Sequence, residues 1–290
     1  MDVFDLIGNT PLVELQRVNP ERARGVRILA KLESRNPGGS VKDRAARHII
    51  LDAEKKGLLP GRRLLDATSG NTGIAYAMLC AARGYGCTLV LPGNASPERL
   101  AILRAYGAQL VLTDPLEGQD GAIDAVRVMA AAEPGQWFYA DQYSNPANPR
   151  AHEETTGPEI WQQTKGEVTH FVAGLGTTGT LIGTARALRT RRPNVGIYAV
   201  EPDGPFHGLE GMKHLATSHV PSIFSAKEAG VRLPVETERA LGVARQLARE
   251  EGLLVGGSGG AAVAGAIEVA RTAAEGSTIV CILPDSRRNF

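Results

Sequence analysis

The 290-residue chain has few of the features that mark specialised classes of protein. Its three cysteines, Cys80, Cys87 and Cys281, are odd in number and lack metal-ligand spacing, so we expect buried free thiols rather than disulfides or a metal site. No apolar run is long enough to span a bilayer, and the N-terminal residues carry no signal pattern. A formal net charge of +1 leaves no basic footprint for nucleic acid. These absences indicate a cytoplasmic protein without a membrane, nucleic-acid or metal partner.

What the chain does contain is a regular alternation of two kinds of apolar segment. Apolar residues make up 43% of the sequence and charged residues 22%, which suits a sizeable core. Short apolar runs, expected as strands, lie at 26–33, 63–68, 87–92, 108–113, 170–174, 196–201 and 278–284. Runs of helical periodicity lie at 41–56, 72–83, 97–106, 118–132, 180–191, 236–251 and 261–274. This order predicts an α/β fold with open, mostly parallel twisted sheets and helices on both faces.

The alternation breaks twice. Residues 137–148 are rich in asparagine, proline and aromatic residues, and residues 203–230 form an irregular insert. We interpret the first break as a lobe boundary, which predicts a smaller lobe of 35–145 and a larger lobe of 1–34 plus 146–290. Long irregular loops in compact domains are usually functional, so the second break is expected to lie near a site.

One lysine stands in an unusual place. Residues 36–40, Asn-Pro-Gly-Gly-Ser, favour a turn, with Ser40 expected as a helix N-cap and Asp43 in the first helical turn. Lys42 therefore faces the positive end of the helix dipole, which disfavours its charged ammonium form and so favours the neutral, nucleophilic amine. A lysine taken alone is far more often a solvated surface residue, so this position by itself does not establish a role.

Two loops that follow predicted strands have the residues of anion sites. Residues 69–73 place Ser69, Gly70, Asn71 and Thr72 directly before a helix, where backbone N–H groups suit a carboxylate and the Asn71 amide suits a ring hydroxyl. An ordinary capped turn uses the same residue types. Residues 174–180 combine glycines with threonine hydroxyls at a helix start, which favours a phosphate.

The second of these loops has a rival interpretation. Residues 174–179 also match Gly-x-Gly-x-x-Gly, and Glu201 closes the next strand at about the spacing of a ribose-binding acid, so a dinucleotide site is an alternative. A third, glycine-rich loop carries Ser258, and Gln142 lies in the first break. The six histidines show neither metal-ligand spacing nor a Ser–His–Asp pattern.

Together these residues supply what pyridoxal 5'-phosphate requires: an amine, a phosphate cradle, a partner for the ring hydroxyl and a partner for the ring nitrogen. Over nearly its whole length the chain resembles the cysteine synthase family, closest to its B branch. The resemblance rests on residues 7–13, 31–33, 36–44, 68–73, 141–142, 145–146, 156–161 and 176–180.

The resemblance implies a two-lobed fold like that of the tryptophan synthase β-subunit, fold type II, with a mobile, substrate-binding smaller lobe and a larger lobe that binds the cofactor phosphate. It also implies roles for individual residues. Lys42 would carry the cofactor as an aldimine and act as the base at Cα, Asn71 would bond the ring hydroxyl and Ser258 would face the ring nitrogen. The phosphate would lie on Gly176, Thr177, Thr178, Gly179 and Thr180. The substrate carboxylate would lie on Thr68, Ser69, Gly70, Thr72 and Gln142.

The implied activity is the synthesis of L-cysteine from O-acetylserine and sulfide through α-aminoacrylate, by a cytoplasmic homodimer. A serine at the ring nitrogen makes a weaker electron sink than an aspartate, which favours loss of a β-leaving group. Lys213 and His214 match a basic pair that would read an anionic donor such as thiosulfate. Residues 284–290 are closer to a cystathionine β-synthase ending, so that activity or a serine or threonine dehydratase is the alternative within the same cofactor class.

Overall fold

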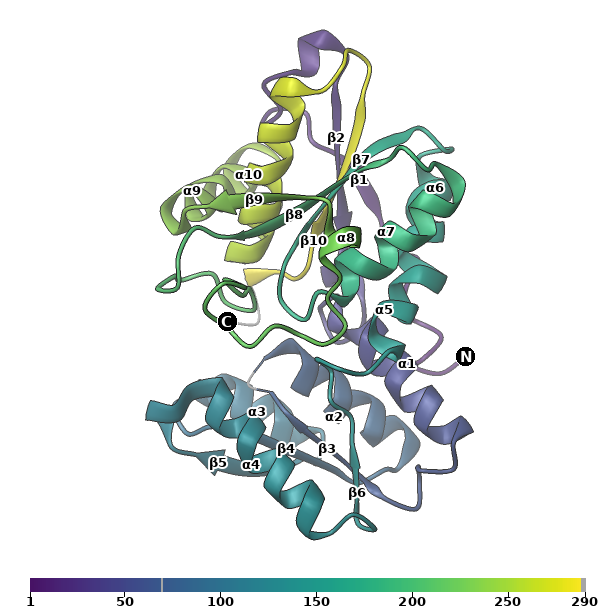
Figure 1. Ribbon diagram of the computed structural model, residues 1–290, viewed down its shortest axis with the longest axis vertical. Helices are drawn as coiled ribbons and strands as arrows, with labels where there is room; N and C mark the ends of the chain where they lie inside the picture. Colours follow the sequence, from purple (N-terminus) through teal and green to yellow (C-terminus); the bar gives the residue numbers. More distant parts are fainter. Residues whose placement is uncertain (69, 288–290) are drawn as a thin grey trace. The chain divides into compact units, whose positions relative to one another are not determined.

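The computed structural model describes residues 1–68 and 70–287, and these fall into two compact units (Figure 1). Unit 1 comprises Met1–Ile7 and Asn36–Asn148. Unit 2 comprises Gly8–Arg35 and the described residues from Pro149 on. The sequence places residues 1–34 in the larger lobe, whereas Met1–Ile7 belong to unit 1.

Unit 1 is built on a four-stranded sheet in the order β5-β4-β3-β6. All three neighbouring pairs are parallel, as the strand–helix alternation predicts. The strands are β3 (Arg63–Ala67), β4 (Cys87–Pro92), β5 (Gln109–Thr113) and β6 (Trp137–Tyr139). The helices are α1 (Lys42–Lys55), α2 (Asn71–Arg83), α3 (Pro97–Ala105) and α4 (Gly118–Ala132), with a 3₁₀ turn at Pro115–Glu117.

Each face of this sheet has its own core. Ile49, Leu79 and Leu89 are fully buried in a cluster to which α1, α2 and α3 contribute side chains. Leu65 and Val126 lie in a second cluster formed with α4. Helices therefore cover both faces, as expected for parallel strands whose backbones are buried.

Unit 2 is built on a six-stranded sheet in the order β1-β2-β10-β7-β8-β9. Only the edge pair β1–β2 is antiparallel among the described residues. The strands are β1 (Leu12–Glu14), β2 (Arg27–Leu32), β7 (Val168–Gly174), β8 (Gly196–Pro202), β9 (Val231–Val235) and β10 (Thr278–Leu283). The longer helices are α6 (Gly157–Gln163), α7 (Gly179–Arg191), α9 (Thr237–Glu250) and α10 (Gly257–Thr272). The shorter segments are α8 (Ala226–Ala229), 3₁₀ turns at Arg22–Arg24 and Glu33–Arg35, and a π-helical turn at His152–Thr156 that follows α5 (Ala147–Ala151).

Successive side chains of the central strand β10 alternate between the two hydrophobic clusters of unit 2. Ile279, Cys281 and Leu283 point into the cluster shared with α9 and α10. Val280 and Ile282 point into the cluster shared with α6 and α7, and Figure 1 shows these two helix pairs on opposite sides of the sheet. The period-two alternation of a buried strand thus supplies both cores. All three cysteines are free and buried, as expected.

The expected α/β architecture is confirmed, but several details are wrong. The break at 137–148 contains β6, which pairs in parallel with β3. Other described elements also have no counterpart in the expected order, among them β1, β9, α5, α6 and α8. The helix expected at 97–106 does begin at Pro97, with the Ser96 hydroxyl accepting from Arg99 N at 3.4 Å. No helix of the described chain combines the length and apolarity needed to cross a bilayer.

A buried cluster of polar residues joins three of the motifs on which the family resemblance rests. Lys31 is fully buried, and its Nζ donates to Thr10 O at 2.6 Å, to Glu159 Oε2 at 2.7 Å and to Gln163 Oε1 at 2.9 Å. The Thr10 hydroxyl donates to Glu33 Oε1 at 2.7 Å. A buried ammonium needs such partners, so these motifs join the N-terminal segment to α6 within unit 2.

Two helical glycines provide a matched test of the packing between α9 and α10. A Cβ at Gly260 would overlap Ala240 O and lie 3.0 Å from Ala244 Cβ, whereas a Cβ at Gly242 meets nothing within 4 Å. Gly260→Ala should lower the free energy of unfolding by about 1–3 kcal/mol through overpacking. Gly242→Ala should raise it by about 0.5–1 kcal/mol, because alanine restricts the unfolded chain. Urea unfolding of both variants measures this, and equal effects would contradict the packing described.

Candidate active site

Lys42 is the first residue of α1, at the end of a turn that is hydrogen-bonded to itself. Gly39 takes φ +84° and its N–H donates to Asn36 O at 2.9 Å. The buried Asp43 carboxylate accepts from Gly38 N at 2.6 Å, and a Cβ at Gly38 would meet that carboxylate. The turn therefore requires glycine at both positions and fixes the start of α1.

Ser40 is not the N-cap that the sequence predicts. Val41 occupies that position with right-handed helical dihedral angles and gives no side-chain cap. The Ser40 hydroxyl accepts instead from Lys42 N at 3.2 Å, and Asn36 Nδ2 donates to Ser40 O at 3.1 Å. Lys42 is half-buried and in the first helical turn, as expected.

The structure brings two predicted carboxylate-binding residues together in unit 1. Thr72 Oγ1 donates to Gln142 Oε1 at 2.7 Å, and both side chains are buried. The Thr68 hydroxyl accepts from Gly70 N at 3.3 Å, and Gly70 is the N-cap of α2. Asn71 is the first residue of that helix. Ser69, also predicted here, lies outside the described residues.

A buried acid, Asp66, is hydrogen-bonded to the backbone of Gln142. Asp66 is the second-last residue of β3, and its carboxylate accepts from Ala67 N at 2.8 Å and from Gln142 N at 3.4 Å. Burial is the main reason that the pKa of Asp66 rises to about 7, with a smaller contribution from Asp141. Burial, then Asp66 itself, raises the pKa of Tyr76 and of Tyr143.

The predicted phosphate loop of unit 2 runs from the end of β7 into α7. Gly176 approaches the carbonyl of Gly211 so closely that a Cβ would overlap its oxygen. Thr178 adopts φ +73°, a left-handed conformation that is rare for a β-branched residue. Gly179 and Thr180 then open α7, whose first N–H groups have no acceptor within the helix.

This loop fits a bound phosphate. Thr178 is 2% exposed, and its Oγ1 has no hydrogen-bond partner among the described residues. A buried orphan hydroxyl in a strained conformation is the kind of group that an anionic ligand satisfies. The N–H groups at the start of α7 add the favourable end of a helix dipole.

Ser258 is the second residue of α10 and is buried. The N-cap before it is Gly256, where a Cβ would overlap the buried Asp285 carboxylate that follows β10. The glycine-rich loop therefore allows the acid to approach the helix start. That Ser258 and Lys42 bind the same cofactor is a prediction from the sequence.

Glu201, the acid of the alternative dinucleotide interpretation, is buried and bonded within unit 2. Its carboxylate accepts from Arg232 at 2.5 Å and from Leu215 N at 3.4 Å. Glu201 thereby joins β8, β9 and the insert. Lys213 and His214 lie in that insert, with Lys213 N donating to Leu175 O at 2.7 Å and His214 Nδ1 2.8 Å from Thr217 Oγ1.

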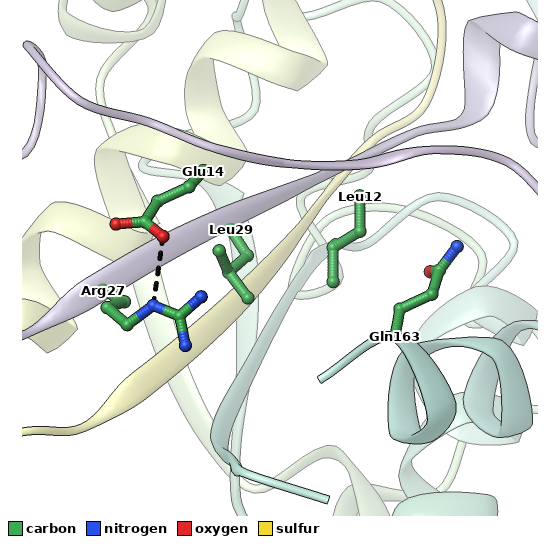
Figure 2. Close-up of a pocket in the computed structure, with 5 residues that line it drawn as sticks. All are labelled: Leu12, Glu14, Arg27, Leu29 and Gln163. Atoms are coloured by element: carbon green, nitrogen blue, oxygen red, sulfur yellow. Dashed lines mark hydrogen bonds and ion pairs between the residues drawn. The ribbon is translucent and has the colours of Figure 1, made fainter. Parts of the chain in front are cut away.

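A pocket of about 300 Å³ in unit 2 contains none of the predicted site residues (Figure 2). It is lined by Leu12, Glu14, Arg27, Leu29 and Gln163. Arg27 Nε donates to Glu14 Oε2 at 3.1 Å, as the dashed line in Figure 2 marks. Gln163 is bonded to Thr10 and Lys31. Because Arg27 and Glu14 bond each other and Gln163 already bonds groups outside the lining, we do not assign the reaction to this pocket. Across the described ranges, no acidic, histidine or cysteine cluster could hold a metal ion.

Two buried polar residues beside the site were not predicted. Asp66 stands in an apolar strand one residue before the Ala67-Thr68 step, and a lone acid in such a run is a usable signal. His152 is 1% exposed and contacts Thr156 and Thr180. Its only sequence signal is a threonine four positions later.

Comparison with known proteins identifies similar sequences and a similar fold. The family model for "pyridoxal-phosphate dependent enzyme" matches residues 3–285. The chain is 50% identical to a cysteine synthase of Aquifex aeolicus, covering 99% of this chain and 90% of that protein. It is 47% identical to cysteine synthase B of Salmonella typhimurium, covering 96% and 90%. A cysteine synthase structure from Entamoeba histolytica superposes with a TM-score of 0.94 at 38% identity, covering 99% and 88%.

Replacing Thr178 should separate stability from ligand binding. Thr178→Gly relieves a left-handed strain of about 1–2 kcal/mol but adds about 0.5–1 kcal/mol of unfolded-state entropy. We therefore expect the unfolding temperature without ligand to stay constant or rise, while binding of inorganic phosphate weakens. Thr190→Gly, in the right-handed last turn of α7, is the control and should only destabilise. A loss of stability in Thr178→Gly as large as that of the control would contradict the strain.

Asp66 should make stability fall as pH rises. Its folded pKa of about 7 lies above the usual value of 3.8, so the folded state holds more protons between these pH values. The free energy of unfolding should therefore decline from about pH 4 to pH 7 by up to several kcal/mol from this group, and level off above. Asp66→Asn should flatten that decline in urea unfolding measured at pH 5, 6, 7 and 8. An unchanged pH slope would contradict the assignment.

Proposed function

The chain belongs to the family of pyridoxal-phosphate dependent enzymes, and from this premise we propose that it makes L-cysteine from O-acetyl-L-serine and sulfide. The observation that carries the proposal is identity of 42–50% with curated cysteine synthases over nearly the whole chain. The unsatisfied Thr178 hydroxyl in the loop before α7 supports it, because the loop suits the phosphate of the cofactor.

The proposed cofactor-binding residues come from both units. Lys42 would hold the cofactor through Nζ, and Asn71 would donate its amide to the ring hydroxyl. Ser258 would bond the ring nitrogen, and residues Gly176, Thr177, Thr178, Gly179 and Thr180 would hold the phosphate. When bound, pyridoxal phosphate withdraws electrons from the substrate's α-carbon and so makes its proton acidic.

The remaining chemistry belongs to the side chains. Lys42 Nζ would take the Cα proton of the serine ester and return a proton to Cα after sulfur adds. Thr68, Ser69, Gly70, Thr72 and Gln142 would bind the substrate carboxylate. The Thr72–Gln142 hydrogen bond fixes the Gln142 amide with its oxygen on Thr72 and its Nε2 3.4 Å from Ala67 O, which preorganises this set.

The reaction balances without an oxidant or a reductant. The bond between Cβ and the ester oxygen breaks and releases acetate, and the bond between Cβ and sulfur forms from hydrosulfide. Division into elimination and addition gives two half-reactions. Lys213 and His214, in the insert that Glu201 anchors, are the proposed contacts for an anionic donor such as thiosulfate. A homodimer and a cytoplasmic location also stay predictions.

The proposal is tested on the full chain with pyridoxal phosphate. The protein should show a visible absorption band that shifts with O-acetylserine and returns with sulfide. Lys42→Ala should lose the band and reduce cysteine formation by at least about 10³-fold, since it removes both the attachment point and the base. Lys55→Ala, at the exposed end of the same helix, is the matched control and should retain both.

Three other outcomes would contradict the proposal. Pyruvate and ammonia formed steadily from serine, without a thiol, would make the protein a dehydratase. Cystathionine formed from serine and homocysteine, in preference to cysteine, would make it a β-synthase of that product. A band that survives in Lys42→Ala would remove Lys42 from its proposed role.

A further inference from the structure

The start of α7 is held against the preceding segment by an unusually close approach within unit 2. A Cβ at Gly183 would overlap Pro149 O and lie 2.9 Å from His152 Cβ. A Cβ at Gly157 would overlap Ala187 Cβ. Small residues thus let the π-helical turn His152–Thr156 lie directly on α7. π-Helical turns of this kind often occur beside functional sites.

This approach builds a line of three hydrogen-bonding side chains. His152 Nδ1 lies 2.8 Å from Thr156 Oγ1, and His152 Nε2 lies 3.2 Å from Thr180 Oγ1. His152 and Thr156 are at most 1% exposed, whereas Thr180 is half-buried. The line therefore begins in the core and ends at the loop before α7.

The direction of the line follows from donor and acceptor chemistry. A hydroxyl donates one hydrogen bond, so Thr180 can donate to an anion only while it accepts from His152 Nε2–H. The other ring nitrogen, Nδ1, is then an acceptor and takes its hydrogen bond from the Thr156 hydroxyl. All three protons point from the core toward the loop.

We infer that His152 is a positioning residue that aims the Thr180 hydroxyl at the cofactor phosphate, with Thr156 fixing the imidazole tautomer. The inference rests on the proposed placement of the phosphate on Gly176–Thr180. Without His152 the Thr180 hydroxyl is free to rotate toward other acceptors, such as backbone carbonyls of its own helix. His152 touches neither substrate nor reacting atoms in this role.

The test is the affinity of the full chain for pyridoxal phosphate, measured by titration of the apoprotein with cofactor. His152→Asn keeps a group near Thr156 but does not reach Thr180, and it should raise the dissociation constant about tenfold. His152→Gln places an N–H near the position of Nε2 and should stay within about threefold of the parent. The ³¹P resonance of the bound phosphate should shift in His152→Asn and return toward the parent position in His152→Gln.

A double-mutant cycle separates positioning from a merely structural role. In a Thr180→Val background, His152→Asn should weaken cofactor binding by less than about twofold, because its effect acts through Thr180. The same tenfold loss in both backgrounds, or no loss in either, would overturn the inference. Thermal unfolding of each apoprotein checks that the variants fold. Failure of the parent chain to bind pyridoxal phosphate would instead contradict the proposed function.

Discussion

The structure depends on one constraint of parallel sheets: strands that run the same way end at the same edge, and the loops after them collect there. In unit 1, β3 ends one residue before Thr68, and α2 begins shortly after it, with Gly70 as its N-cap and Asn71 and Thr72 as its first residues. In unit 2, β7 ends at Gly174 and leads into the glycine–threonine loop. Polar groups that the sheet interior could not accommodate are thus concentrated where helix N-termini supply free N–H groups.

The fold was largely predictable because its signals are local. Parallel strands buried on both faces give short apolar runs, and amphipathic helices give longer periodic ones, so β4 and α4 begin and end as expected. Three of the edge or near-terminal strands, β1, β6 and β9, were not predicted, and their local features explain why. β6 has three residues, and β9 carries Pro234, which an edge strand tolerates but which breaks a strand signal.

The site was predictable to the extent that each residue has a signal in its own loop. Lys42 and the loop from Gly176 to Thr180 stand out beside turns and helix starts. Asp66 and His152 do not, because their importance lies in what they touch. Asp66 reaches Gln142 N across 76 positions, and His152 reaches Thr180 across 28. Partners so far apart in sequence become visible only when the chain is folded.

The buried acid behind Gln142 has a consequence for the proposed substrate. A carboxylate bound by Thr72 and Gln142 adds negative charge near Asp66, whose pKa burial has already raised to about 7. A like charge raises that pKa further, so the folded protein takes up part of a proton at neutral pH when the anion binds. Protonation removes the repulsion that an ionised Asp66 would exert. The hydrogen bonds from Ala67 N and Gln142 N keep the group in place in either state. Because burial favours the neutral form of Asp66, a substrate carboxylate can bind nearby with less electrostatic repulsion.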